Sequence, residues 1–256
     1  MRSAIVSVPE TCCSRLSIST KANLPPSWQK ITCANPSTAT PEVATLRVTE
    51  IFHSLQGEAR SVGRPTAFVR LTGCPLRCGY CDTTYAFSGG ELLDIEAVLT
   101  QVARKKSPCV TVTGGEPLAQ PECLTLLTAL CDAGYEVSIE TSGAFDIAGI
   151  DERVSIVMDL KTPASGELAR NRIENIELLQ PKDQLKFVIC NRTDYEWARF
   201  KLAEFELTGR VSDVLFSASH GELESSELAA WILEDQLDVR LQVQLHKLLW
   251  GDTPGV

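Results

Sequence analysis

Three cysteines lie close together in the chain and could hold a metal centre. Cys74, Cys78 and Cys81 have the spacing Cys-x3-Cys-x2-Cys. Structural zinc prefers four protein ligands, and a fourth such as His53 or Cys109 would have to fold back from elsewhere in the chain. A four-iron cluster held by three cysteines instead leaves one iron open to a small molecule. The spacing therefore favours a ligand-binding iron–sulfur centre, with zinc and metal-free thiols as the alternatives.

The residues between these cysteines also suit such a centre. Gly73 and Gly79 are expected to let the loop wrap tightly, because glycine adopts backbone angles that other residues avoid. Tyr80 directly precedes the third cysteine and is expected to shield one side of the site.

A second segment, Thr113-Gly114-Gly115-Glu116-Pro117, directly follows a predicted strand. Its glycines would expose backbone amides and carbonyls to a ligand, and Glu116 adds an acceptor suited to an ammonium group. Taken alone, the segment is typical of a plain turn in which proline starts a helix. Because this segment follows the three-cysteine loop in the sequence, a ligand-binding turn is favoured over a plain one.

Polar residues follow or interrupt three further predicted strands. Thr141 and Ser142 suit contacts to a ribose or a carboxylate, with a polar turn as the alternative, and Lys161 follows the next strand. Lys186 lies inside the apolar run Leu185–Val188. It is either on a solvated face or paired inside a barrel, where it could contact an adenosyl group or a substrate.

Alternating strand-like and helix-like segments position these residues. The patterns predict strands over 67–71, 109–113, 136–141, 155–160, 184–189, 213–218 and 240–245, and helices over 94–106, 122–133, 194–205 and 225–234. This order predicts an α/β fold with a mainly parallel sheet. Such folds place their ligand site at the carboxyl ends of the strands, where the polar motifs lie.

Composition excludes several classes of protein. The chain has 256 residues, 44% of them hydrophobic and 22% charged, which is ordinary for a globular domain. No apolar run reaches about eighteen residues, so we expect no membrane span. The net charge of -9 argues against general binding of nucleic acid. Ten cysteines in a chain long enough to build its own core, without a secretory signal pattern, indicate reduced thiols and a cytoplasmic protein.

The N-terminal stretch differs from the rest. Ser, Thr and Pro make up 17 of its first 41 residues. We predict a disordered extension over residues 1–44 and one core domain over residues 45–256. A transit peptide and a misassigned start are the alternatives. Cys12, Cys13 and Cys33 lie in this stretch and receive no role.

The cysteine loop and the Gly-Gly-Glu-Pro segment together resemble the radical S-adenosylmethionine superfamily. Across residues 46–256 the chain further resembles the 7-carboxy-7-deazaguanine synthase family. The motifs that carry this narrower resemblance are Phe52–Glu58, Gly63–Pro65, Arg70, Cys81–Thr83, Glu140–Gly143 and Leu241–Lys247. The resemblance implies a partial, incomplete TIM-type barrel, the radical SAM fold.

The resemblance also implies cofactors and a reaction. The cofactors are a 4Fe-4S cluster, S-adenosyl-L-methionine and Mg²⁺, and the reduced cluster cleaves S-adenosylmethionine to a 5′-deoxyadenosyl radical. The family converts 6-carboxy-5,6,7,8-tetrahydropterin to 7-carboxy-7-deazaguanine on the pathway to queuosine. Hydrogen is taken from C6, the ring contracts, ammonia is lost and the hydrogen returns. The implied partners are the pterin, an external flavodoxin-like one-electron reductant and a second copy of the chain.

Residues that match the family's motifs take roles by the same resemblance. Cys74, Cys78 and Cys81 would hold the cluster, and Thr83 would bind Mg²⁺. S-adenosylmethionine would contact Tyr80, Gly114, Gly115, Glu116, Thr141, Ser142 and Lys161. The substrate would contact Leu55, Gln56, Gly57, Glu58, Arg70, Thr113 and His246, with Glu58 reading the pterin edge and Arg70 binding the carboxylate. The resemblance assigns no protein acid or base.

Two positions depart from the family pattern, and two other functions are alternatives. Thr253-Pro254 stands where a basic residue is expected just before Gly-Val. Ala59 stands where the family usually has a glycine, so the loop after Glu58 is expected to shift slightly. A glycyl-radical activase shares the cluster loop and the Gly-Gly-Glu-Pro turn but has no use for Glu58, Arg70 and His246 together. A non-catalytic zinc-binding protein is the second alternative.

Overall fold

A computed structural model describes residues 44–251, 253 and 255 of the chain. All of them belong to the compact unit Val43–Val256. The predicted extension over residues 1–44 and its three cysteines lie outside the described residues, apart from Ala44. No helix in the described part of the chain is long and apolar enough to cross a membrane.

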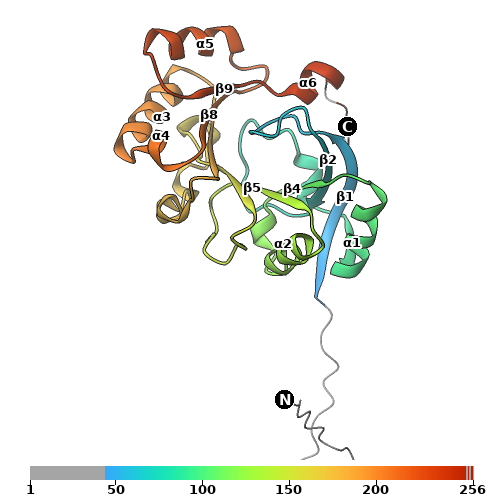
Figure 1. Cartoon of the computed structure of the whole chain (residues 1–256). Coiled ribbons are helices and arrows are strands. Elements are labelled where there is room, and N and C mark those ends of the chain that lie inside the picture. Colours follow the sequence, from blue (N-terminus) through green and yellow to red (C-terminus); the bar gives the residue numbers. More distant parts are fainter. Residues whose placement is uncertain (1–43, 252, 254, 256) are drawn as a thin grey trace, which may run out of the picture. The chain divides into compact units, whose positions relative to one another are not determined.

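A curved nine-stranded sheet forms the centre of the described domain (Figure 1). Its order is β3-β1-β2-β4-β5-β6-β7-β8-β9, with β1 antiparallel to its neighbours and the strands from β2 to β9 parallel. The two edge strands, β3 and β9, are not paired with each other, so the barrel is incomplete, which confirms the predicted fold class. The strands are β1 (Thr45–Leu55), β2 (Pro65–Leu71), β3 (Glu91–Asp94), β4 (Cys109–Gly114), β5 (Glu136–Thr141), β6 (Ser155–Asp159), β7 (Gln184–Ile189), β8 (Asp213–Ala218) and β9 (Arg240–Gln242).

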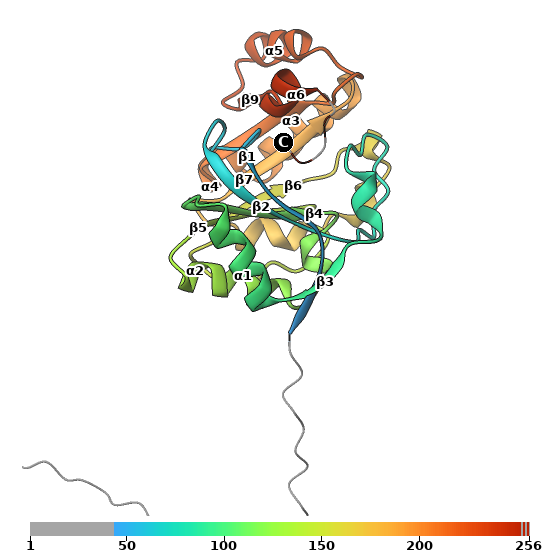
Figure 2. The ribbon, with the colours of Figure 1, turned by 90° about the vertical axis from the view of Figure 1, so that its right-hand side faces the viewer.

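Helices cover the outside of the curved sheet (Figures 1 and 2), except α6, which contributes to the cavity lining. Residue types at the start and on one face account for the first helix. Asp94 caps its N-terminus by accepting a hydrogen bond from the Ala97 amide at 2.7 Å, and Val98 and Val102 form a buried face toward the core. The helices are α1 (Ile95–Arg104), α2 (Cys123–Asp132), α3 (Arg192–Glu204), α4 (Leu207–Arg210), α5 (Ser225–Glu234) and α6 (Leu245–Trp250).

Six of the predicted strands and all four predicted helices are confirmed within a few residues of their ends. The seventh strand, predicted over 240–245, is wrong beyond Gln242. The alternation of apolar and polar residues continues, but the chain leaves the sheet after Gln242, and α6 begins at Leu245. The side chains of Gln242 and Gln244 both bind Glu58. Two antiparallel strands, β1 and β3, were not predicted as separate elements.

The loop between β1 and β2, residues 56–64, crosses the open side of the barrel. The Ala59 amide donates to the Gln242 side chain at 2.7 Å, so the loop joins the first hairpin to the last strand. Ala59 has a left-handed φ of 61°, a backbone conformation that favours glycine. That conformation costs roughly 1 kcal/mol in alanine, and burial of the methyl group against Val157 and Leu215 offsets about the same amount. Alanine is therefore tolerated at this position.

Candidate active site

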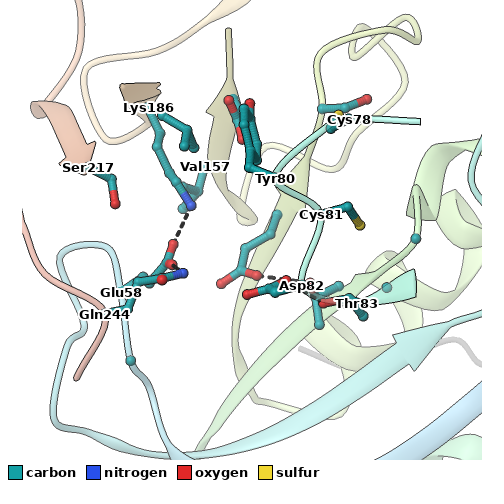
Figure 3. A pocket seen from close by; sticks show the side chains of 18 of the residues that line it. Glu58, Cys78, Tyr80, Cys81, Asp82, Thr83, Val157, Lys186, Ser217 and Gln244 are labelled. Atoms are coloured by element: carbon teal, nitrogen blue, oxygen red, sulfur yellow. Dashed lines mark hydrogen bonds and ion pairs between the residues drawn. The ribbon is translucent and has the colours of Figure 1, made fainter. Parts of the chain in front are cut away.

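One cavity of about 400 Å³ opens at the carboxyl ends of the parallel strands. It is lined by the three cysteines, by both glycines of the Gly-Gly-Glu-Pro turn and by all the predicted substrate residues. Figure 3 shows Cys78 and Cys81 on one side of this cavity and the pair Lys186–Glu58 on the other. Of the predicted site residues, Glu116 alone does not line it.

The cysteine loop is fixed on both sides. Gly73 donates to the Ala86 carbonyl at 2.8 Å and has a φ of 97°, so glycine is needed there as predicted. Arg77 donates from its backbone amide to Glu167 at 2.6 Å and from its guanidinium to the carbonyls of Cys74 and Leu76. The loop thus keeps its three thiols at the cavity wall.

One glycine assignment needs correction. Gly79 has no left-handed φ, and a methyl group there would lie in ordinary contact, 3.7 Å from the Ala164 carbonyl oxygen. Glycine is sterically required at both Gly114 and Gly115, because a Cβ would lie 2.2 Å from the Leu71 carbonyl oxygen at the first and 2.2 Å from the Gly73 carbonyl oxygen and 2.8 Å from Cys74 Cβ at the second. The Gly-Gly pair therefore packs against the end of β2 and the start of the cysteine loop as well as facing the cavity. The Gly115 amide donates to the Leu71 carbonyl at the end of β2, and the Glu116 amide donates to the Gly73 carbonyl.

Substitution of Gly115 by alanine is expected to displace Cys74 and prevent assembly of a metal centre. Forcing a methyl group into backbone typically costs about 1–3 kcal/mol, and here the backbone that must move carries a cluster ligand. Gly79→Ala is the matched control and should change stability by less than about 0.5 kcal/mol. Iron content after anaerobic reconstitution and urea unfolding measure both effects. Equal iron content in the two variants would contradict this account.

The donor set fits an iron–sulfur cluster better than a zinc ion. Within the described residues, no three His, Cys, Asp or Glu side chains gather closely enough to hold one metal ion. Cys109 lies at the amino end of β4, where its thiol faces Glu136 at 3.8 Å, and neither it nor His53 lines the cavity. Three thiols spread along one wall suit a larger, multi-iron centre with one open iron. The structure therefore does not support the zinc alternative.

The pKa values of two of these thiols are raised. Burial is the main cause for both Cys74 and Cys78. A metal centre needs thiolates, so its assembly would release protons and proceed better as pH rises.

Beside the cysteines, some residues of the cavity lining carry a buried polar atom without a protein partner. Among the described residues, Tyr80 and Asp159 line the cavity, and Tyr80 Oη and Asp159 Oδ1 are buried and unpaired. Lys161 binds the other Asp159 oxygen at 2.8 Å and lies 5.7 Å from the centre of the Tyr80 ring. Buried polar atoms are normally satisfied, so this wall is complementary to a polar ligand.

Glu116 lies behind that wall. Its side chain is fully buried and accepts hydrogen bonds from Thr141 Oγ1 at 2.8 Å, from the Ser142 amide at 2.6 Å and from the Leu118 amide at 3.0 Å. Its carboxylate therefore holds the end of β5 against the turn after β4. This arrangement differs from the predicted direct contact between Glu116 and an ammonium group.

On the opposite side of the cavity, Glu58 is held by three donors. Lys186 and Gln242 bind its Oε2, the latter at 3.1 Å, and Gln244 binds Oε1 at 2.7 Å. Burial alone would raise the pKa of Glu58, but the positive charge of Lys186 and these hydrogen bonds hold it below its usual 4.5. Glu58 is therefore anionic at neutral pH, and Lys186 lies in the barrel interior, the second of its two predicted positions.

Glu140, on β5, is a second carboxylate in this part of the cavity. Gln56 donates to its Oε1 at 3.2 Å and Thr113 to its Oε2 at 2.9 Å, so each oxygen keeps a free lone pair. Burial, followed by the negative charge of Glu58, raises the pKa of Glu140. The sequence motif containing Glu140 was noted, but the residue itself was not predicted to line the site.

Arg70 has its guanidinium ready for a carboxylate. Its Nε donates to Glu50 at 2.7 Å, while the terminal Nη atoms have no partner among the described residues. The side chain is 16% exposed and lines the cavity. The free edge of a guanidinium matches a carboxylate through two parallel hydrogen bonds.

His246 packs directly on Gly57. A Cβ at Gly57 would lie 2.1 Å from His246 Nδ1, and the Leu245 amide donates to the Gly57 carbonyl at 3.0 Å. Glycine in the Gln-Gly-Glu motif therefore makes room for the imidazole, which lines the cavity from α6. Two segments far apart in sequence meet here.

Comparison with known proteins gives the site its context. Residues 68–164 match the family model of the radical SAM superfamily. A 7-carboxy-7-deazaguanine synthase from Koribacter versatilis is 44% identical over 82% of this chain and its own full length. The enzyme of the same name from Chlorobaculum tepidum is 42% identical over 83% of this chain and 98% of its own.

A solved structure shows the same fold. The crystal structure of QueE from Escherichia coli superposes with a TM-score of 0.61 at 22% sequence identity, covering 79% of this chain and 95% of that one. Both matching sequences and this structure span nearly the whole described domain.

Proposed function

Because the chain belongs to the 7-carboxy-7-deazaguanine synthases of the radical SAM superfamily, we propose that its cavity converts 6-carboxy-5,6,7,8-tetrahydropterin to 7-carboxy-7-deazaguanine. The chain is a radical SAM lyase of queuosine biosynthesis. The single observation that carries the site assignment is that Cys74, Cys78 and Cys81 share one cavity with Arg70 and Glu58. An activase, the runner-up, has no need of the second group.

The cluster and S-adenosylmethionine would occupy the cysteine side of the cavity. Together they supply a 5′-deoxyadenosyl radical, and the protein binds and orients the groups around it. We propose Tyr80, Gly114, Gly115, Thr141, Ser142 and Lys161 as the S-adenosylmethionine site, with the unpaired Asp159 oxygen as an added acceptor. Glu116 acts indirectly in this proposal, by holding Thr141 and Ser142 in place.

The pterin would lie between the cysteine side and the Lys186–Glu58 pair. Its amidine–amide edge offers N–H donors, and Glu58 and Glu140 both have an unused lone pair toward the cavity. Arg70 would take the substrate carboxylate on its free edge. Leu55, Gln56, Gly57, Thr113 and His246 complete the substrate wall.

Mg²⁺ is proposed to bind at Thr83, where the donors are oxygens. Thr83 Oγ1 bonds Asp82 Oδ1 at 2.7 Å, and both residues line the cavity. Mg²⁺ prefers oxygen ligands and retains waters, so one hydroxyl beside a carboxylate suits it. A divalent cation would also offset the charge of Asp82 against a carboxylated substrate.

The remaining assignments are proposals of the same kind. Electrons would come from an external flavodoxin-like protein, the enzyme would be a homodimer, and neither nucleic acid nor membrane would take part. A cytoplasmic location suits the seven cysteines of the described domain, all of which are free thiols.

An anaerobic turnover experiment tests the function. Reconstituted protein with S-adenosylmethionine, Mg²⁺, a strong reductant and 6-carboxytetrahydropterin should yield 7-carboxy-7-deazaguanine and ammonia, detected by mass spectrometry and an ammonia assay. Arg70→Gln should lower kcat/KM by about 100-fold or more, because it removes the cation facing the substrate carboxylate. Arg64→Gln is the matched control, since Arg64 pairs with Glu136 outside the cavity. Cleavage of S-adenosylmethionine without the deazaguanine product would refute the substrate assignment.

A further inference from the structure

We propose that Glu50 is a positioning residue that orients Arg70 toward the carboxylate of the substrate. This inference rests on the proposed function, since it concerns how the same site selects a carboxylated pterin. Glu50 was assigned no role from sequence, and it does not line the cavity. Its effect would reach the substrate only through Arg70.

The backbone brings the two residues together. Glu50 on β1 is the direct cross-strand partner of Arg70 on β2. The pairing of these strands shifts register between Val48 and Glu50, as in a β-bulge. Bulges redirect the side chains that follow them and are frequent beside active sites. The irregularity therefore sets where the Glu50 carboxylate points.

The hydrogen bonds determine which edge of the guanidinium is free. Glu50 Oε1 accepts from Arg70 Nε at 2.7 Å and from Tyr85 Oη at 2.8 Å. A carboxylate placed on the Nη atoms would have blocked the edge that two parallel bonds require. Because Glu50 takes Nε, the Nη edge remains for a ligand.

Aromatic rings complete the support. The Arg70 guanidinium carbon lies 5.5 Å from the centre of the Phe52 ring and 5.8 Å from that of Tyr85. Phe52 is itself stacked on Phe68 at 4.8 Å. Tyr85 follows the cysteine loop, so Glu50 connects that loop to Arg70 through one oxygen atom. Glu50 thus fixes Arg70 against a rigid background.

Loss of the Glu50 charge and loss of the Arg70 orientation are expected to change substrate binding in opposite directions, so the positioning role can be tested. The negative charge of Glu50 repels a substrate carboxylate, so its removal alone would tighten binding. Loss of orientation would weaken binding. Glu50→Gln retains an oxygen that accepts from both donors and removes the charge, whereas Glu50→Ala removes both. A positioning role predicts that alanine harms binding and glutamine does not.

The experiment measures equilibrium binding of two unreactive ligands to the reconstituted enzyme with S-adenosylmethionine and Mg²⁺ present. The ligands are 6-carboxypterin and pterin, which differ in the carboxylate. Glu50→Ala should raise the Kd of 6-carboxypterin about tenfold or more and leave that of pterin within about twofold. Glu50→Gln should bind both within about threefold of wild type. Tyr85→Phe is the control that removes the other hydrogen bond to Glu50.

The outcomes distinguish failure of the Glu50 positioning role from failure of the proposed function. Equal loss for both ligands in Glu50→Ala, or no loss for either, would overturn the positioning role while leaving the proposed function intact. Tighter binding of 6-carboxypterin by Glu50→Ala would show that charge dominates and would also overturn it. Failure of the wild-type enzyme to prefer 6-carboxypterin over pterin would refute the role of Arg70, and the inference about Glu50 with it.

Discussion

Replacement of Cys81 by alanine is expected to give a folded, colourless protein without turnover. The Cys81 side chain is partly exposed and outside the hydrophobic core, so the metal-free fold loses little by its removal. The cluster loses one of its three protein ligands, and the remaining pair cannot retain it. Iron and sulfide per chain, visible absorbance and product formation should all fall to background.

Cys123→Ala is the matched control for that experiment. Cys123 is fully buried at the start of α2 and away from the cavity. Its substitution should lower the free energy of unfolding by about 1 kcal/mol and leave iron content unchanged. Cys81→Ala should therefore lose the metal centre but little stability, whereas Cys123→Ala should lose stability but keep its iron. Iron retained by Cys81→Ala at the wild-type level would contradict the cluster assignment.

Replacement of Lys186 by methionine is expected to be the most damaging change on the opposite side of the cavity. It leaves Glu58 in a largely buried position without its cation, where the two side chains are only 15% and 13% exposed. Removal of one partner from a buried ion pair typically costs about 3 kcal/mol or more. We expect a loss of that order in the free energy of unfolding at neutral pH and a fall in kcat/KM of about 100-fold.

The loss should depend on pH in a defined direction. In the wild-type protein the pKa of Glu58 lies below its usual 4.5, so its ionised form stabilises the fold at neutral pH. Without Lys186, burial would raise that pKa above the unfolded value. The folded variant would then bind more protons than the unfolded chain, and its stability would increase as pH falls. The difference from wild type should therefore be smaller at pH of about 5 than at about 7.5.

A double variant separates stability from function. Glu58→Gln with Lys186→Met removes both charges, so most of the lost stability should return. Turnover should not return, because the carboxylate that faces the substrate is gone. Urea unfolding at the two pH values and steady-state kinetics measure these effects. A Lys186→Met protein as stable as wild type at pH of about 7.5, or equally destabilised at both, would contradict the paired-charge account.

The residues with chemical motifs could be predicted because they are local in sequence. Three cysteines within one loop, and the glycine-rich turn after the next strand, show their spacing directly. Parallel strands then bring their carboxyl ends to one edge, so residues such as Thr113 and Thr141 must lie near the cysteines. Sequence reasoning therefore placed most of one side of the cavity.

The other side depends on contacts that no local pattern contains. Glu58 binds Gln244, which is 186 residues away in the sequence, and Lys186, which is 128 residues away. A signal was nevertheless present in the strands. Ser138 and Glu140 alternate with apolar residues in β5, whereas strands with both faces covered by helices are apolar throughout. Such alternation indicates a polar barrel interior, and it also accounts for Lys186.

Two roles were not visible from the motif residues alone, because they depend on neighbours in the fold. Gly79 and Gly115 are both glycines near the cluster, yet only the second is sterically required, because another segment packs against it. Glu116 carries a suitable charge, but Thr141 and Ser142 occupy its carboxylate. Residue type at a motif position therefore did not distinguish a ligand-facing side chain from one that supports the wall.

The most direct test of the central claim, that one cavity brings the cysteine-bound centre next to a pterin held by Arg70 and Glu58, uses substrate deuterated at C6. Hydrogen transfer requires the two bound groups to be in contact, so it reports the shared cavity and not only the two chemistries. We predict deuterium in recovered S-adenosylmethionine or 5′-deoxyadenosine, together with formation of 7-carboxy-7-deazaguanine. Formation of 5′-deoxyadenosine free of deuterium, with the substrate recovered intact, would contradict the claim.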